Sequence, residues 1–128
     1  MFTRILIAAA ATLAVAQPAL AVERQPYSVA ALTSAQAQGR SVLVDVAAWW
    51  CPVCRSQEAK IKRITANPKF AKLLILRLDF DKQKNEWRAL GANRQATLIG
   101  YKGRQEVGRV AFQTNEAIIA DLLQKTVQ

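Results

Sequence analysis

Two short apolar segments limit most strongly what this chain can fold into. Residues 41–47 and 73–80 are nearly continuously apolar over strand-like lengths, as expected for strands that are covered on both faces. Residues 52–65 between them are compatible with a helix, and the interval is long enough for a crossover that leaves the two strands parallel. The sequence therefore predicts a sheet with helices on either side.

The segments around this unit extend the same plan. Residues 27–38 predict a helix that stops at Gly39, and residues 84–90 predict a second, short helix. Asn67-Pro68 stops or restarts the central helix, because the residue before a proline is restricted to extended conformations. Helices and strands thus alternate through the first three quarters of the chain.

The last quarter has a different pattern. Residues 97–101 and 105–112 read as two strands joined by a tight turn at Gly103, which predicts an antiparallel hairpin. Thr114 is the expected N-cap of a final amphipathic helix. Two strand–helix–strand crossovers followed by a hairpin predict a single α/β domain, with a mixed central sheet and helices on both faces.

The first 21 residues read as a secretion signal. Arg4 supplies the positive end, residues 5–16 an apolar run, and Ala19-Leu20-Ala21 a small-x-small cleavage site. The run is shorter than the ~20 residues that a membrane-spanning helix needs, which favours cleavage over an uncleaved anchor. We therefore expect an exported domain of residues 22–128 without a stable membrane anchor, periplasmic if the source is a Gram-negative bacterium.

The chain is strongly basic, with a formal charge of +9. Removing the signal takes only Arg4, which leaves 17 basic and 9 acidic residues. The basic residues are scattered, and the export signal argues against nucleic acid as a partner. A solvated basic surface is expected, which steers a protein toward acidic partners, more weakly at high salt.

The only two cysteines, Cys51 and Cys54, lie at the start of the central helix. A structural zinc site needs four ligands, and the chain has no histidine to complete one. A purely structural disulfide is disfavoured, because a bridge across so short a loop contributes only roughly 2 kcal/mol of chain entropy. Attachment of c-type haem is excluded, because Arg55 follows Cys54 where a histidine is required.

Thiol–disulfide exchange is the chemistry that this placement favours. A helix N-terminus presents backbone N–H groups and partial positive charge to the sulfur of Cys51, and Arg55 adds a cationic neighbour; both stabilise the reactive thiolate. Cys54, one turn into the helix, is expected to be better buried and to attack a mixed disulfide formed at an exposed Cys51. Cys51 is thus the predicted nucleophile and Cys54 the predicted resolving thiol.

With this pair, the sequence resembles the thioredoxin superfamily from about Arg40 to the C-terminus. The matching segments are residues 42–54, 78–81 and 96–103, with Asp45 at the spacing of the family's buried acid. Trp50 matches the tryptophan before the nucleophile. Among exported members, the C-terminal domain of the membrane reductant conductor DsbD is most similar in style. The resemblance implies a thioredoxin-like fold.

The resemblance also implies roles for residues around the pair. Asp45 would accept the proton of Cys54, a role that favours a raised pKa, whereas the alternative is an acid at a strand end with solvent access. Trp50 would be a contact platform, with Pro52 and Val53 shaping the site beside it. Trp49 and Trp87 are as readily explained by packing.

One segment, Gln95-Ala96-Thr97, departs from the family pattern. The family usually has a cis-proline before the threonine that matches Thr97, and this sequence has Ala96. A cis bond costs about 3–4 kcal/mol before other residues, so the Gln95–Ala96 peptide is expected to be trans. In the family that proline shapes the groove in which a partner's chain pairs with backbone, so an altered groove and a specialised partner are expected.

These observations predict an exported thiol–disulfide oxidoreductase that needs no cofactor. Pro52-Val53 lacks the histidine of strong oxidants, which favours a reductase. Its partners would be a protein with a disulfide or thiol and an electron-donor protein, such as a membrane-bound one. Two alternatives stay open: a binding module without general exchange activity, favoured by Ala96, and a thiolate metal carrier, disfavoured by the lack of histidine.

Overall fold

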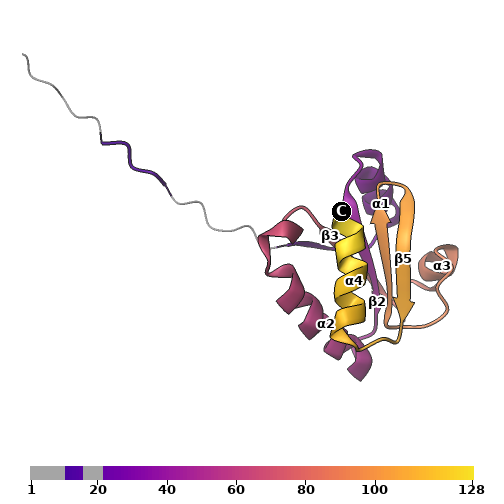
Figure 1. Ribbon diagram of the computed structural model, residues 1–128. Coiled ribbons are helices and arrows are strands. Elements are labelled where there is room, and N and C mark those ends of the chain that lie inside the picture. The colour runs from indigo at the N-terminus through magenta and orange to yellow at the C-terminus, as the bar shows by residue number, and fades with distance from the viewer. Residues whose placement is uncertain (1–10, 16–21) are drawn as a thin grey trace, which may run out of the picture.

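A five-stranded mixed sheet forms the middle layer of the molecule (Figure 1). The computed structural model describes residues 11–15 and 22–128, so most of the predicted signal segment, residues 1–21, lies outside the described residues. The strand order is β1-β3-β2-β4-β5. The strands are Glu23–Pro26 (β1), Ser41–Ala47 (β2), Leu74–Asp79 (β3), Thr97–Lys102 (β4) and Gln105–Ala111 (β5).

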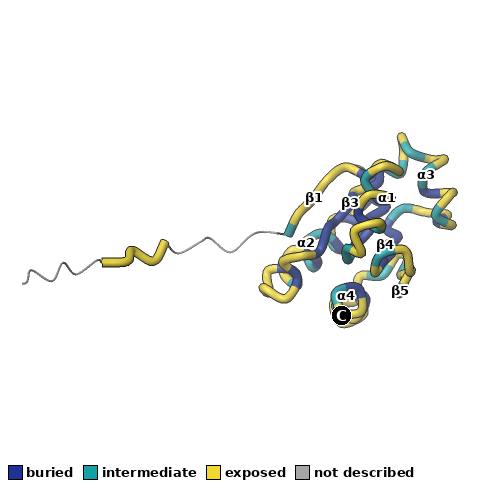
Figure 2. Tube along the Cα trace, turned by 90° about the horizontal axis from the view of Figure 1, so that it is seen from above, coloured by how far each residue is buried: buried dark blue, intermediate teal, exposed yellow. Residues whose placement is uncertain are grey.

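Helices cover both faces of this sheet. The helices are Val29–Ala37 (α1), Pro52–Thr65 (α2), Lys84–Ala89 (α3) and Glu116–Val127 (α4), and a 3₁₀ turn at Pro68–Phe70 (η1) follows α2. Buried residues of α1 and α3 pack on one face of β2, whereas those of α2 and α4 pack on the other. Figure 2 shows the buried strands between these helical layers. The predicted fold class is confirmed.

The central strand β2 decides which side chains reach the α2 face. Successive side chains of a strand point to opposite faces. Val42, Val44 and Val46 belong to the core beneath α1 and α3, whereas Leu43 packs with α2 and α4. By the same alternation Asp45 lies on the α2 face, two residues before Ala47, which belongs to the buried cluster of the two cysteines.

Strand β1 is an element that the apolar pattern did not predict. Its four residues, Glu-Arg-Gln-Pro, are all exposed, and they pair in parallel with β3 at the edge of the sheet. The connection from β1 through α1 to β2 therefore forms one parallel crossover, and that from β2 through α2 to β3 forms the other. A polar edge strand has no alternation to detect, because neither of its faces is covered.

The direction of β4 also differs from the expected second crossover. We expected residues 97–101 to return parallel to residues 73–80, but β4 runs antiparallel to β2. Hydrophobic pattern does not encode strand direction, since either direction buries the same residues. The hairpin of β4 and β5 is confirmed.

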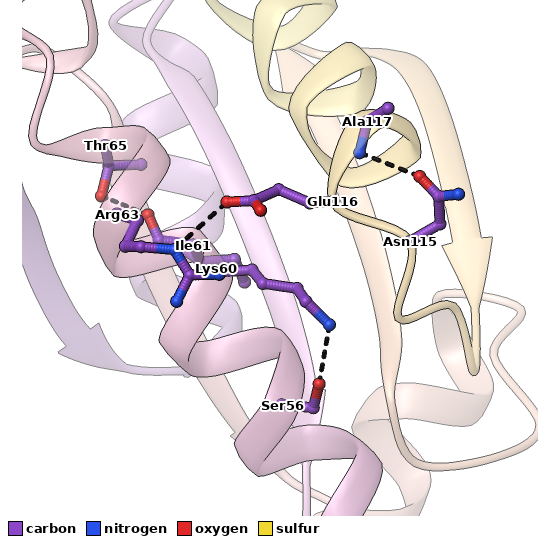
Figure 3. Close-up of polar contacts among 8 residues, drawn as sticks. All are labelled: Ser56, Lys60, Ile61, Arg63, Thr65, Asn115, Glu116 and Ala117. Carbon is purple, nitrogen blue, oxygen red and sulfur yellow. Dashed lines mark hydrogen bonds and ion pairs between the residues drawn. The ribbon is translucent and has the colours of Figure 1, made fainter.

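The N-cap of α4 is Asn115, so the assignment of this role to Thr114 is wrong. The side-chain oxygen of Asn115 accepts hydrogen bonds from the N–H groups of Ala117 (2.9 Å, Figure 3) and Ile118 (3.3 Å). Asparagine is at least as good an N-cap as threonine, so propensity alone did not separate the two neighbours. In the described part of the chain no helix is long and apolar enough to span a bilayer.

Candidate active site

Cys51 is the N-cap of α2, as its place in the sequence predicts. Its Sγ accepts a hydrogen bond from the backbone N–H of Cys54 at 3.1 Å. Pro52 takes the first helical position, where the N–H that proline lacks would have no partner in the helix. Both cysteines are free thiols in this structure. The start of α2 thus places a backbone hydrogen-bond donor on the sulfur of Cys51.

We expected Cys51 to be exposed and Cys54 to be better buried. This prediction is wrong, because Cys51 is only 1% exposed and Cys54 is 5% exposed. The two cysteines form one buried cluster with three small side chains, Ala47, Ala48 and Ala96. Val53 and Phe80 lie at the edge of this cluster and are partly buried against it. A partner's disulfide must therefore reach into the site or shift these neighbours to meet Cys51.

The buried environment of Cys54 sets its protonation state. Burial raises the pKa of Cys54 to about 11, and the neighbouring sulfur of Cys51 and the carboxylate of Asp45 act in the same direction. Cys54 is therefore a protonated thiol at neutral pH, which has to lose its proton before it can attack.

Asp45 is buried beneath α2, with 3% of its surface exposed. Burial raises the pKa of its carboxyl group to about 6; the charge of Arg77 on the neighbouring strand opposes this rise and that of Glu58 on α2 reinforces it. The alternative of a solvent-accessible acid is wrong, and the expected raised pKa is confirmed. Its role as a proton acceptor stays a prediction.

An open pocket of about 520 Å³ is lined by residues of β1, β3, the loop before α2 and the middle of α2. Arg77, Glu58 and Trp49 line it, as does Ala47. Arg24 enters the same pocket and pairs with Glu58 at 2.8 Å, while the second carboxylate oxygen of Glu58 is buried without a hydrogen-bond partner among the described residues. The charged groups that act on Asp45 therefore gather around one cavity.

The tryptophans next to Cys51 differ in their surroundings. Trp50 is 42% exposed, and its ring N–H donates to the carboxylate of Asp81 at 2.9 Å. Trp49 is 81% exposed, so its interpretation as a packing residue is wrong. Trp87, in contrast, is buried and stacks on Phe80 at 5.0 Å between ring centres, which confirms a packing role. The loop before Cys51 thus presents aromatic surface to solvent.

Arg55 contacts the loop before the nucleophile. Its guanidinium donates to the backbone carbonyl of Trp49 at 3.3 Å. Within the described residues it makes no hydrogen bond to the sulfur of Cys51, so its role in stabilising the thiolate stays a prediction.

Ala96 belongs to the same buried cluster as Cys51 and Cys54 and is completely buried. Its peptide bond to Gln95 is trans, as expected, but its backbone has a left-handed φ of +58°. Its N–H donates to the carbonyl of Val46 at 2.7 Å, and its carbonyl accepts from the N–H of Phe112 at 2.8 Å. Thr97 follows at the start of β4 and is buried, and Gln95 before it is half-buried. The segment therefore lies where it was expected, opposite the cysteines.

Gln57 is a residue of the site that sequence reasoning missed. Its side-chain amide donates to the carbonyl of Ala96 at 3.1 Å, and only 1% of the residue is exposed. The one signal in the sequence is its spacing, since it occupies the buried stripe of α2 between Cys54 and Ile61. A polar residue at such a position needs a hydrogen-bond partner, but the spacing does not say which one.

Comparison with known proteins places this geometry in a family. The thioredoxin family model matches residues 27–125, which include both cysteines, Asp45 and the Ala96 segment. The chain belongs to the thioredoxin family. The thioredoxin fold with a Cys-x-x-Cys pair at the start of α2 indicates thiol–disulfide redox activity of the general thioredoxin type.

Solved structures of thioredoxin-type proteins are similar to this one. Trxlp from Edwardsiella tarda EIB202 is 42% identical with a TM-score of 0.75, over 79% of this chain and 98% of that chain. A thioredoxin from Malassezia sympodialis (18% identity, TM-score 0.73, 89% and 97% covered) and the thioredoxin NaTrxh from Nicotiana alata (21%, 0.70, 88% and 97%) share the fold. A search of curated proteins found no match.

Proposed function

We propose that this protein is an exported thiol–disulfide oxidoreductase that reduces a disulfide in a specialised protein partner. The observation that carries the proposal is the hydrogen bond from the N–H of Cys54 to the sulfur of Cys51, with the buried acid Asp45 beneath the same helix. This arrangement combines a sulfur that accepts a backbone hydrogen bond at a helix N-terminus, a protonated second thiol and a group able to take its proton.

The reaction has two steps. The Cys51 thiolate attacks one sulfur of the partner's disulfide, forming a mixed disulfide while the other partner sulfur leaves as a thiolate and takes up a proton. Cys54 then attacks the Cys51 sulfur, its proton passes to Asp45, and the second partner sulfur is released. The partner gains two electrons, and the Cys51–Cys54 disulfide must be reduced again by an electron-donor protein.

Two features support the reducing direction. A strong oxidant owes its potential to a stabilised reduced form, usually a low-pKa thiolate. Here burial raises the pKa of Cys54, and Pro52-Val53 supplies no histidine to stabilise a thiolate. Export rests on the signal-like residues 1–21, and the specialised partner on Ala96.

Turnover of a disulfide substrate tests the proposal. The purified protein should reduce insulin in the presence of an electron donor, and Cys51→Ser should abolish this activity. Cys54→Ser should retain the first step and accumulate a mixed disulfide, which also captures the natural partner from an extract of the exported compartment. A wild-type pair that cannot cycle, or a Cys51→Ser variant that keeps full activity, would refute the redox function.

The role of Asp45 has its own measurement. Asp45→Asn removes the proton acceptor, so we expect the intramolecular attack by Cys54 to slow about 10²-fold, within the usual range for general-base catalysis. Rapid-quench analysis of the mixed disulfide measures this step. Alkylation of Cys51 by iodoacetamide is the control and should change little. An unchanged rate of the second step would show that Asp45 is not the acceptor.

A binding module without exchange activity is the second candidate, and the burial of Cys51 favours it. In that case a partner would bind Cys51→Ser as tightly as the wild type, and no mixed disulfide would form with Cys54→Ser.

Fusion of residues 1–21 to a reporter enzyme tests export, with cleavage expected before Val22.

A further inference from the structure

Gln57 is a buried side chain whose hydrogen bonds all reach other parts of the fold. Its amide nitrogen donates to the carbonyl of Ala96 at 3.1 Å and to that of Gln113 at 2.9 Å. Its amide oxygen is buried without a partner among the described residues. Burial of an amide is costly unless it is hydrogen-bonded, so the tertiary bonds of Gln57 are what offset its position inside the molecule.

The two carbonyls belong to segments that meet at the redox site. Ala96 precedes β4, and Gln113 follows β5, next to Phe112, whose N–H also bonds to the carbonyl of Ala96. Gln57 therefore ties α2 to both ends of the β4–β5 hairpin at one point.

Ala96 is held there in a conformation that it would not adopt freely. A non-glycine residue with a φ of +58° is strained by of order 1 kcal/mol or more, and it persists only where its surroundings enforce it. Three hydrogen bonds fix its peptide groups, through Val46, Phe112 and Gln57. Only the bond from Gln57 comes from a side chain, so only that bond can be removed by substitution without changing the backbone.

Helix α2 thus holds both sides of the redox site. Cys54 and Gln57 lie on the same buried stripe of α2, three residues apart, and Ala96 shares one buried cluster with Cys51 and Cys54. We propose that Gln57 is a positioning residue, which holds Ala96 against the two sulfurs and thereby sets how a protein partner reaches Cys51. This inference rests on the proposed exchange function. It concerns protein partners because Cys51 is buried among residues that include Ala96, and a protein has to fit against these residues to bring its disulfide to Cys51.

The test compares a protein disulfide with a small one. Gln57→Met keeps the length and apolar stem of the side chain and removes both donors together with the unpaired oxygen. We expect the KM for insulin to rise roughly tenfold, the scale of one or two lost hydrogen bonds, with kcat nearly unchanged. Reduction of oxidised glutathione should change less than twofold, because a small disulfide needs little of the surface beside the cysteines. Gln57→Glu, which faces the two carbonyls with a carboxylate, should raise the KM for insulin further.

Thr65→Val is the matched control. Thr65 is buried on the same stripe of α2, but among the described residues its hydroxyl bonds only to the carbonyl of Ile61 in its own helix, at 2.7 Å (Figure 3). Removing this hydroxyl should leave the KM for insulin and the rate of glutathione reduction unchanged. A KM for insulin in Gln57→Met equal to that of the wild type would overturn the proposal, as would an equal loss of activity toward both substrates.

Amide hydrogen exchange separates this inference from the proposed function. In Gln57→Met the N–H groups of Ala96 and Phe112 should exchange at least tenfold faster, whereas Thr65→Val should leave them protected. If the wild type reduces neither substrate, the proposed function fails, and this measurement still decides the role of Gln57. Unchanged protection of both amides would show that Gln57 does not hold Ala96.

Discussion

The chemistry of the site depends on where two single groups, Asp45 and Cys54, are buried. Each loses contact with water, which disfavours its charged form and raises its pKa. The charge of Asp45 also raises the pKa of Cys54, so the two titrations are linked. The protonation state of each group is thus a property of the folded environment and not of the residue alone.

Stability should depend on pH through Asp45. Its pKa is raised from 3.8 to about 6 by burial, so the folded state holds this proton more tightly than the unfolded state. The stabilisation is therefore complete below about pH 4 and is lost as the pH rises through about 6, by up to about 3 kcal/mol. Asp45→Asn removes this dependence.

Urea unfolding of both proteins across this range gives the measurement. The free energy of unfolding of Asp45→Asn relative to the wild type should increase between pH 4 and 7. Taking the difference between the two proteins cancels the contribution of exposed carboxyl groups such as Glu23 and Glu106, whose pKa values are lowered by their arginine partners. A difference that is constant with pH would contradict the raised pKa.

Replacing Ala96 by proline should destabilise this protein. Proline fixes φ near −65°, whereas Ala96 has φ +58°, and proline would remove the N–H that donates to Val46. We expect Ala96→Pro to lower the free energy of unfolding by about 3 kcal/mol or more. Ala96→Gly, which tolerates positive φ, should be within about 1 kcal/mol of the wild type. Thermal unfolding compares the three, and a proline variant as stable as the wild type would mean that the segment rearranges freely.

The secondary-structure elements explain how these residues are presented. Helix α2 begins with the sulfur of Cys51 as its cap, and its buried stripe carries Cys54 and Gln57 to the same side. Its far end is joined to the start of α4 by an ion pair between Arg63 and Glu116 at 3.3 Å (Figure 3). In addition, the side chain of Gln57 on α2 donates to the carbonyl of Gln113, in the loop just before α4. The ion pair and this hydrogen bond together link α2 to the start of α4.

The cap of α4 can be tested at this scale. Asn115→Ala removes the acceptor for two N–H groups and should lower the free energy of unfolding by about 1 kcal/mol. Thr114→Ala, at the neighbouring position, should have little effect, within about 0.5 kcal/mol. Chemical denaturation of the pair decides between the two caps, and the reverse order of effects would favour Thr114.

In the whole molecule, helices pack on both faces of one sheet, and β4 and α4 approach closely at Gly100. A methyl group added at Gly100 would collide with the hydroxyl of Thr126, a fully buried side chain fixed by its bond to Leu122. The absence of a side chain at Gly100 therefore lets α4 pack directly on β4.

Gly100→Ala should therefore destabilise the fold by about 1–3 kcal/mol through overpacking. Gly108→Ala is the comparison, since its added methyl group would meet only a flexible leucine methyl group, of Leu122, at 3.1 Å. Differential scanning calorimetry should show the larger fall in Tm for Gly100→Ala. Equal effects would mean that α4 moves away from the sheet at little cost.

Much of the fold was predictable because it is encoded locally. The apolar runs of β2 and β3, the amphipathic pattern of α4 and the glycine turn of the hairpin each depend on neighbouring residues, and all were predicted. Strand β1 and the direction of β4 were not, because an exposed edge strand and a strand's direction leave no periodic signal.

The same division holds for the site. By itself the sequence determined that two thiols stand at the start of a helix after a buried strand with an acid in it, because strand and helix periods are local. Only the tertiary structure decided that Cys51 is buried, that Ala96 is left-handed and that Gln57 bonds to Ala96. Those facts depend on contacts between segments about 40 to 50 residues apart, such as Gln57 with Ala96 and Val46 with Ala96, which no local pattern specifies.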